Sequence, residues 1–225
     1  MNIILHPPST PPPDITSLLT RAESIAGLSL GELSQLANIN VPEHFRQHKG
    51  FTGQLIELWL GATAGSTPQQ DFPELGVELK TIPVDRYGKV LETTYVCFAH
   101  TKIPFGTTWQ NSSVRNKLQR VLFVPILGER SIAPRERIVG MPKLWRPNTQ
   151  QEQVLQQDWE ELCEMISLGN IEKINAKRGV ALHIRPKAAD GKALTPATGN
   201  KGESILTRPR GFYLRKSFTQ AIFEC

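Results

Sequence analysis

A chain of 225 residues, with 39% hydrophobic and 21% charged residues, is long enough to bury its own core and too apolar to stay disordered. It contains no apolar run of the roughly 18 residues that a membrane span needs, and its start lacks the basic and apolar regions of a signal peptide. The three cysteines, at positions 97, 163 and 225, lie too far apart for a disulfide framework or a zinc site. We therefore expect a cytoplasmic protein without membrane contact.

The formal net charge of +5 is unevenly distributed along the chain. Residues 101–150 carry a net charge of +7 and residues 176–217 carry +8, whereas residues 151–175 between them carry −5. Two basic blocks of this kind are typical of proteins that bind a polyanion such as nucleic acid. Charge alone leaves open the alternative that these lysines and arginines only keep the surface solvated.

The first quarter of the chain is predicted to be helical after a proline-rich strap over about residues 1–13. Asp14 is a typical helix cap and Gly27 a typical stop, while Ser29 and Glu32 have the spacing of a capping box. The helices predicted here cover residues 15–26, 30–37 and 52–60. A loop is predicted to follow them over residues 61–70.

The rest of the chain mixes strands with helices. Strands are predicted over residues 76–84, 91–99, 121–127, 180–184 and 211–214, and helices over 114–120, 149–168 and 217–223. This order is typical of an α/β or α+β fold in which helices flank a sheet. No linker separates independent parts, so we predict a single domain over residues 1–225.

The segment 71–80 (DFPELGVELK) carries the most informative chemistry. Strand alternation places Glu78 and Lys80 on one face, and Asp71 lies at the mouth of the strand. Two neighbouring carboxylates repel each other and attract a hard divalent cation with oxygen ligands. A lysine beside such a cation can orient an attacking water. The segment therefore indicates metal-dependent hydrolysis of a phosphodiester.

Alternatives remain open on this pattern alone. An E-x-K triplet occurs about once by chance in a chain of this length, and Asp190 and Lys192 form a D-x-K in a predicted loop. Glu78 and Lys80 could also be a surface pair on an edge strand. Glu57, a single carboxylate in an apolar helix, could complete a three-carboxylate cluster or lie on an exposed stripe.

Beyond these patterns, the chain closely resembles the MutH family, the nicking endonucleases of methyl-directed DNA mismatch repair. The matching stretches are 53–62 (GQLIELWLGA), 71–72, 75–85, 129–132, 158–162, 184–189 and 209–214. They span nearly the whole chain beyond the proline-rich start. The resemblance implies an α/β, restriction-endonuclease-like fold with a central mixed sheet, flanking helices and two lobes around a DNA-binding cleft.

The resemblance also implies roles for particular residues. Its metal-binding acids correspond to Asp71 and Glu78, its catalytic lysine to Lys80 and a supporting carboxylate to Glu57. Its DNA contacts correspond to Lys49, Lys117, Arg185, Pro186 and Lys187. The tyrosine that senses adenine methylation corresponds to Tyr213.

The implied activity is Mg²⁺-dependent nicking of the unmethylated strand, 5′ to the G of hemimethylated GATC sites in double-stranded DNA. Mn²⁺ or Ca²⁺ could occupy the same metal site. The implied partners are MutL directly and MutS indirectly, and a monomer is expected. Two alternatives stay open: a GATC-specific type II restriction endonuclease that cuts both strands, and a non-catalytic DNA-binding repair protein whose acids are structural.

Overall fold

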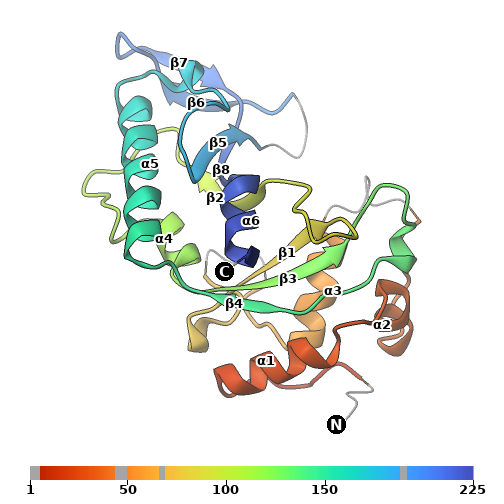
Figure 1. The fold of residues 1–225 in the computed structure, drawn as a ribbon. Helices are drawn as coiled ribbons and strands as arrows, with labels where there is room; N and C mark the ends of the chain where they lie inside the picture. The colour runs from red at the N-terminus through yellow and green to blue at the C-terminus, as the bar shows by residue number, and fades with distance from the viewer. Residues whose placement is uncertain (1–5, 44–49, 66–68, 188–191, 225) are drawn as a thin grey trace. The chain divides into compact units, whose positions relative to one another are not determined.

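The computed structural model describes residues 6–43, 50–65, 69–187 and 192–224. The chain divides into two units, each built from two separate stretches of sequence (Figure 1). Unit 1 holds the described residues of 1–92 and 119–146, and unit 2 those of 93–118 and 147–225.

Three helices of unit 1 begin or end at predicted residues. They are α1 (Ile15–Ser24), α2 (Leu30–Leu36) and α3 (Phe51–Leu60). The Asp14 carboxylate accepts a hydrogen bond from the Ser17 N–H and caps α1. Ser29 and Glu32 form the predicted capping box at the start of α2. Gly61, with φ +76°, ends α3 in the left-handed conformation that favours glycine.

These helices cover one face of a three-stranded sheet in unit 1 (Figure 1). Its strands are β1 (Glu78–Val84), β3 (Val121–Leu127) and β4 (Lys143–Trp145), in the order β1-β3-β4. β1 and β3 are parallel, and β3 and β4 are antiparallel, so the sheet is mixed. Short 3-10 helices lie at Pro73–Leu75 and Pro134–Glu136. The core between helices and sheet includes Leu18, Leu33, Ile56, Trp59, Leu79, Leu122 and Val124.

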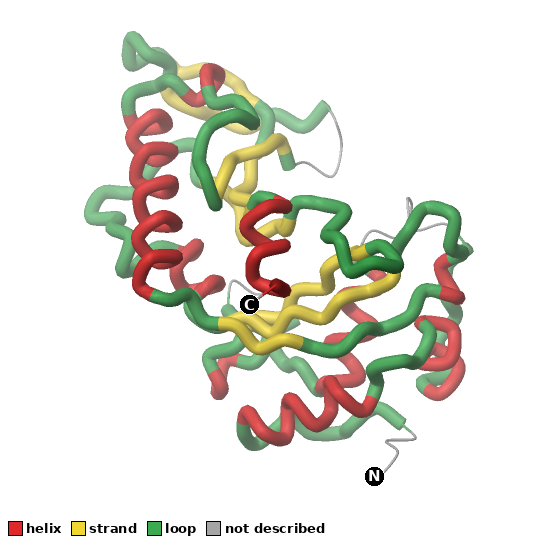
Figure 2. The backbone as a smooth tube through the Cα atoms, in the orientation of Figure 1, coloured by secondary structure: helices red, strands yellow, loops and turns green. Residues whose placement is uncertain are grey.

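Unit 2 contains a second sheet, which is antiparallel, and a separate hairpin. The sheet has the order β2-β8-β5 and consists of β2 (Thr94–Ala99), β8 (Arg210–Leu214) and β5 (Leu182–Pro186). The hairpin pairs β6 (Thr195–Thr198) with β7 (Ser204–Thr207). The helices are α4 (Ser113–Leu118), α5 (Thr149–Ser167), α6 (Lys216–Glu224) and the 3-10 turn Ile171–Lys173. Figure 2 shows α5 as the longest helix of the unit.

The predicted α/β class is confirmed, with differences in how the strands associate. The strands outside the mixed sheet of unit 1 form separate antiparallel sheets, because β2, β5 and β8 pair only with one another. The strands β4, β6 and β7 were not predicted; they have three or four residues each, too few for a periodic pattern. Among the described residues, no helix combines the length and apolar character that crossing a bilayer requires.

Candidate active site and nucleic-acid interface

A tight turn brings Asp71 next to Glu78. Phe72 and Val77 pair as an antiparallel bridge, with N–H···O distances of 2.9 and 3.2 Å. The 3-10 turn between them ends at Gly76, whose φ of +61° lets the chain reverse. Residues on either side of an antiparallel pair also face each other, so Asp71 comes alongside the start of β1. We call residues 71–80 the acidic hairpin.

Hydrogen bonds hold both carboxylates of the acidic hairpin in place. The Leu79 N–H donates to Asp71 Oδ2 at 2.7 Å. The Lys80 ammonium donates to Glu78 Oε1 at 2.6 Å, which confirms that these two side chains share a face of the strand. Glu78 is only 2% exposed, so the alternative of a surface Glu/Lys pair is wrong.

The backbone around the acidic hairpin is anchored on three sides. The Glu78 N–H donates to the Arg120 carbonyl oxygen at 3.0 Å, where β1 and β3 begin to pair. The Arg120 guanidinium donates to the Leu75 carbonyl oxygen at 2.9 Å and holds the turn. The Thr63 N–H donates to the Asp71 carbonyl oxygen at 3.2 Å and ties in the chain after α3. The two acids and the lysine are thus preorganised by hydrogen bonds within unit 1.

Glu57 projects from α3, and its side chain is half-buried. Its Oε1 lies 3.8 Å from where a Cβ on Gly53 would sit, so the carboxylate leans back over the preceding helical turn. In the part of the chain that the structure describes, no three His, Cys, Asp or Glu side chains are grouped closely enough to hold a metal ion. The three-carboxylate cluster that includes Glu57 is therefore not formed in this structure.

The donors of the acidic hairpin fit a hard divalent cation. Asp71 and Glu78 offer carboxylate oxygens, which Mg²⁺ prefers over nitrogen or sulfur. A carboxylate has about four lone-pair positions, so the hydrogen bonds from Leu79 and Lys80 do not exhaust its acceptor capacity. Mg²⁺ is commonly held by one or two carboxylates together with waters and substrate phosphates, which this pair can satisfy without Glu57.

A second group of predicted residues comes together on the antiparallel sheet of unit 2. In the register of this sheet, His183 pairs with Tyr213 and Arg185 with Gly211. The Arg185 guanidinium lies 5.7 Å from the centroid of the Tyr213 ring and donates to the Thr93 hydroxyl at 2.8 Å. Arg185 and Pro186 are exposed at the end of β5, followed by Lys187. The sheet thus groups four predicted DNA contacts.

Sequence reasoning missed the aromatic residues of β2 that complete this group. The Tyr95 ring lies 5.3 Å from the Tyr213 ring, edge to face, and the Lys187 ammonium is 4.5 Å from its centroid. Phe98 in turn packs edge to face on Tyr95 at 5.9 Å. The only signal in the sequence is two aromatics within one predicted strand, and it does not reveal their partners. We call Tyr95, Phe98, Arg185, Lys187, Gly211 and Tyr213 the recognition face.

Of the remaining predicted contacts, Lys117 lies in the described part of the chain and Lys49 does not. Lys117 is half-buried in the last turn of α4. Lys49 lies outside the described residues, as does Asp190, the acid of the second D-x-K motif. Their roles stay predictions.

Two charged residues, a buried aspartate and a half-buried arginine, hold the segment at the start of β5. The Asp158 carboxylate on α5 accepts hydrogen bonds from the N–H groups of three consecutive residues, at 2.7–2.9 Å: Val180, Ala181 and Leu182. The Arg215 guanidinium donates at 2.7 Å to the carbonyl oxygens of Ala176, Arg178 and Gly179. Together they fix where β5 starts relative to α5 and β8. Sequence reasoning did not find this role either.

Burial shifts two pKa values at the recognition face. Desolvation raises the pKa of the Tyr213 phenol, and the nearby Arg185 guanidinium opposes that rise. Desolvation also lowers the pKa of His183, and the positive charges of Arg215 and Arg185 lower it further. The Ala176 backbone opposes this shift, although neither ring nitrogen of His183 reaches full hydrogen-bond geometry with a partner among the described residues. His183 is thus held as a neutral ring against Tyr213, 6.3 Å between centroids.

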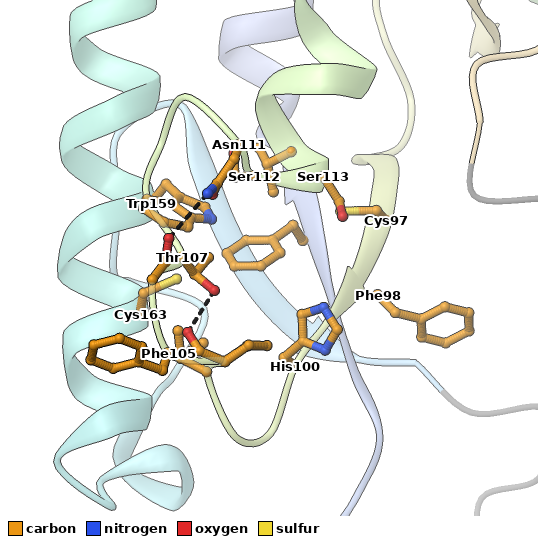
Figure 3. Close-up of a pocket in the computed structure, with 15 residues that line it drawn as sticks. Cys97, Phe98, His100, Phe105, Thr107, Asn111, Ser112, Ser113, Trp159 and Cys163 are labelled. Carbon is orange, nitrogen blue, oxygen red and sulfur yellow. Dashed lines mark hydrogen bonds between the residues drawn. The ribbon is translucent and has the colours of Figure 1, made fainter. Parts of the chain in front are cut away.

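Unit 2 also contains a pocket of about 360 Å³ between β2, α5 and the loop that follows β2 (Figure 3). Its polar side chains are engaged locally: Thr107 donates to the Pro104 carbonyl oxygen and Asn111 to that of Gly106. Burial raises the pKa of the Cys163 thiol in its wall to about 12, so the reactive thiolate is scarce at neutral pH.

Comparison with known proteins finds relatives of this chain in one family. The family model of the DNA mismatch repair enzyme MutH matches residues 60–158, which include the acidic hairpin. The DNA mismatch repair protein MutH of Escherichia coli O127:H6 is 55% identical over 217 residues, covering 96% of this chain and 95% of the relative. That of Klebsiella pneumoniae subsp. pneumoniae is 55% identical over 218 residues, covering 97% and 94%.

Proposed function

Since the chain belongs to the MutH family of DNA mismatch repair endonucleases, we propose that it nicks the unmethylated strand of hemimethylated GATC sites, 5′ to the G, in a Mg²⁺-dependent reaction. The observation that carries this proposal is the acidic hairpin. It presents two carboxylates and a lysine on one hydrogen-bonded frame, with Lys80 Nζ 2.6 Å from Glu78 Oε1.

In the proposed mechanism, Asp71 and Glu78 hold the metal ion. When bound, Mg²⁺ supplies positive charge that stabilises the phosphate oxygens of the substrate and the developing charge on the leaving oxygen. The Lys80 ammonium, held by Glu78, donates to the attacking water and orients it toward phosphorus. The family resemblance gives Glu57 on α3 a supporting role, although among the described residues it forms no metal-binding group with the two acids. Because Glu78 is buried, bulk water is kept away from its side of the site.

Sequence recognition falls to unit 2 in this proposal. Arg185 and Lys187 can donate to O6 and N7 of guanine in the major groove, which distinguish guanine from the other bases. Tyr213 would contact the exocyclic amino group of adenine, where an added methyl group would clash. Lys49 and Lys117 would contact phosphates, which predicts binding that weakens steeply with salt. A single domain whose two lobes surround a DNA cleft remains a prediction.

The proposal includes partners and a location. As a mismatch-repair enzyme, the protein would act as a monomer on cytoplasmic double-stranded DNA and be stimulated directly by MutL, after MutS detects a mismatch. The names of its relatives, DNA mismatch repair proteins, support this setting.

The test uses three plasmids with GATC sites: unmethylated, hemimethylated and fully methylated. The purified chain is incubated with each in Mg²⁺, with and without MutL, and denaturing gels map any break. The proposal predicts nicks in unmethylated strands only, 5′ to the G, and more of them with MutL.

Other outcomes would replace the proposal. Concerted cutting of both strands would assign the chain to GATC-specific restriction, which usually pairs two active sites. Binding to the plasmids without cutting, even with MutL, would make the acids structural. Nicking with Mn²⁺ or Ca²⁺ but not Mg²⁺ would correct only the metal.

A further inference from the structure

A β-bulge in β2 changes the direction of one aromatic side chain. Tyr95 pairs with Tyr213 on β8, but the next paired residue is Cys97, opposite Phe212, so Val96 is an extra residue. In a regular strand, residues three apart face opposite sides of the sheet. The extra residue cancels this alternation, and Phe98 pairs with Gly211 on the same face as Tyr95 and Tyr213. The bulge thus adds an aromatic ring to the recognition face.

The ring of Phe98 is not used by the fold. Its side chain is 63% exposed, although it packs edge to face on Tyr95. In Figure 3 it points away from the side chains that converge on the neighbouring pocket. Burying so exposed an apolar ring on binding is favourable, since folding has removed little of its surface from water.

The surroundings of Phe98 favour DNA as the ligand that covers it. Tyr95, which Phe98 contacts, lies against the Lys187 ammonium, and Arg185 adds a second cation on the same face. The strands β2, β5 and β8 contain no acidic residue. A duplex offers phosphates to the cations and apolar sugar and base edges to the rings, whereas an apolar protein surface would leave both cations without counter-charges.

We propose that Phe98 is a further DNA-binding residue, whose ring contacts the sugar and base edges of a base pair flanking GATC. The inference rests on the proposed function, because Arg185 and Tyr213 must read the GATC site itself. Phe98 contacts Tyr95, which in turn contacts Tyr213, so its ring lies one aromatic side chain away from Tyr213 and can reach a base pair next to the one that Tyr213 contacts. Phe98 therefore adds affinity and a preference for particular flanking base pairs.

The test compares Phe98→Ala with Phe105→Ala, a matched control at a fully exposed phenylalanine of the same unit. Dissociation constants are measured by fluorescence anisotropy, without added divalent metal, on duplexes with one GATC site and randomised flanking pairs. Loss of the apolar surface that the ring buries on binding predicts that Phe98→Ala binds about tenfold more weakly and loses the flanking preference. Phe98→Leu, which keeps an apolar side chain, is expected to fall between it and the wild type.

The outcomes separate this inference from the proposed function. If Phe98→Ala matches Phe105→Ala in affinity and flanking preference, while Arg185→Ala binds more weakly, Phe98 does not contact DNA and the function stands. If the wild type shows no preference for GATC, the proposed function itself fails. Unchanged DNA binding with a loss of MutL stimulation would instead assign the ring to a protein partner and overturn the proposal.

Discussion

The acidic hairpin and the recognition face are built in opposite ways. The hairpin takes all its groups from ten consecutive residues, and a local turn and a buried strand hold them in place. The recognition face takes its groups from three strands that lie far apart in the sequence, and its side chains are exposed or half-buried. In the hairpin, hydrogen bonds fix carboxylates; on the recognition face, rings and cations lie against one another.

This difference shows what each region needs for its proposed task. Metal-assisted hydrolysis needs donors fixed before the substrate arrives, because misplaced groups lose most of their effect. DNA recognition needs groups at the surface that a duplex can cover. Such groups can come from strands that lie far apart in the sequence, because the sheet brings them together. Substitutions in the hairpin should therefore alter the rate of cleavage, whereas those around the recognition face should alter binding.

The largest effect is expected from removing the charge of Glu78. Glu78→Gln keeps the size of the side chain but removes a metal-binding oxygen and the ion pair with Lys80. We expect nicking to fall by at least about a hundredfold, as after loss of a key electrostatic group, with little change in the dissociation constant for DNA. Glu74→Gln, at an exposed acid of the same turn, is the control and should nick like the wild type. Near-wild-type nicking by Glu78→Gln would remove the hairpin from the chemistry.

The same contrast explains what the sequence could predict. The contact between Glu78 and Lys80 is predictable because strand alternation places the two side chains on one face without knowledge of any partner strand. The sequence leaves two positions open for Glu57, since whether it joins two other acids depends on how α3 lies against the sheet. The grouping of Tyr95 with Lys187 depends on sheet register and on a bulge, which no local pattern encodes. The exposed Phe98 was missed for the same reason.

The next effect tests whether the recognition face depends on distant anchors. Asp158 is buried and receives charge-assisted hydrogen bonds from three backbone N–H groups ahead of β5. Asp158→Asn removes the charge and turns an amide group toward these donors, so we expect a loss of about 2 kcal/mol in the free energy of unfolding. Urea unfolding measures this loss, and anisotropy should show weaker DNA binding as β5 shifts.

The control for this anchor lies on the same helix. Glu161→Gln removes an exposed acid of α5 that pairs with Arg178, and surface pairs of this kind contribute little. It should leave both stability and DNA binding close to those of the wild type. Equal behaviour of the two variants would show that Asp158 does not set the position of β5.

A smaller effect is expected where β8 makes room for an aromatic ring. A Cβ at Gly211 would lie 2.8 Å from Cε2 of Tyr95 and 3.2 Å from the Cys97 carbonyl oxygen. Gly211→Ala must therefore displace the Tyr95 ring, and we expect roughly fivefold weaker DNA binding, within the range for one aromatic contact. In a Tyr95→Leu background the same substitution should cost less, because the ring is gone. If the losses in DNA affinity from the two substitutions simply add, Gly211→Ala does not act through the Tyr95 ring.

The smallest effect concerns the pH dependence of the recognition face. Desolvation, Arg215 and Arg185 lower the pKa of His183 below its ordinary value of 6.5, against smaller opposing effects of the Ala176 backbone and Asp158. Below that value the unfolded chain binds a proton that the folded chain refuses, so His183 lowers the stability of the wild type as the pH falls. His183→Gln removes this contribution, and the free energy of unfolding of the variant should rise relative to that of the wild type as the pH falls from about 7 to about 5.

Urea unfolding across this range gives the difference, with His100→Gln, at an exposed position, as the control for losing a histidine. Parallel pH profiles for wild type and His183→Gln would contradict the prediction. If the free energy of unfolding of the variant rises relative to that of the wild type as the pH falls, the His183 ring beside Tyr213 has to stay neutral in the folded protein. The acidic hairpin contains no histidine and does not share this requirement.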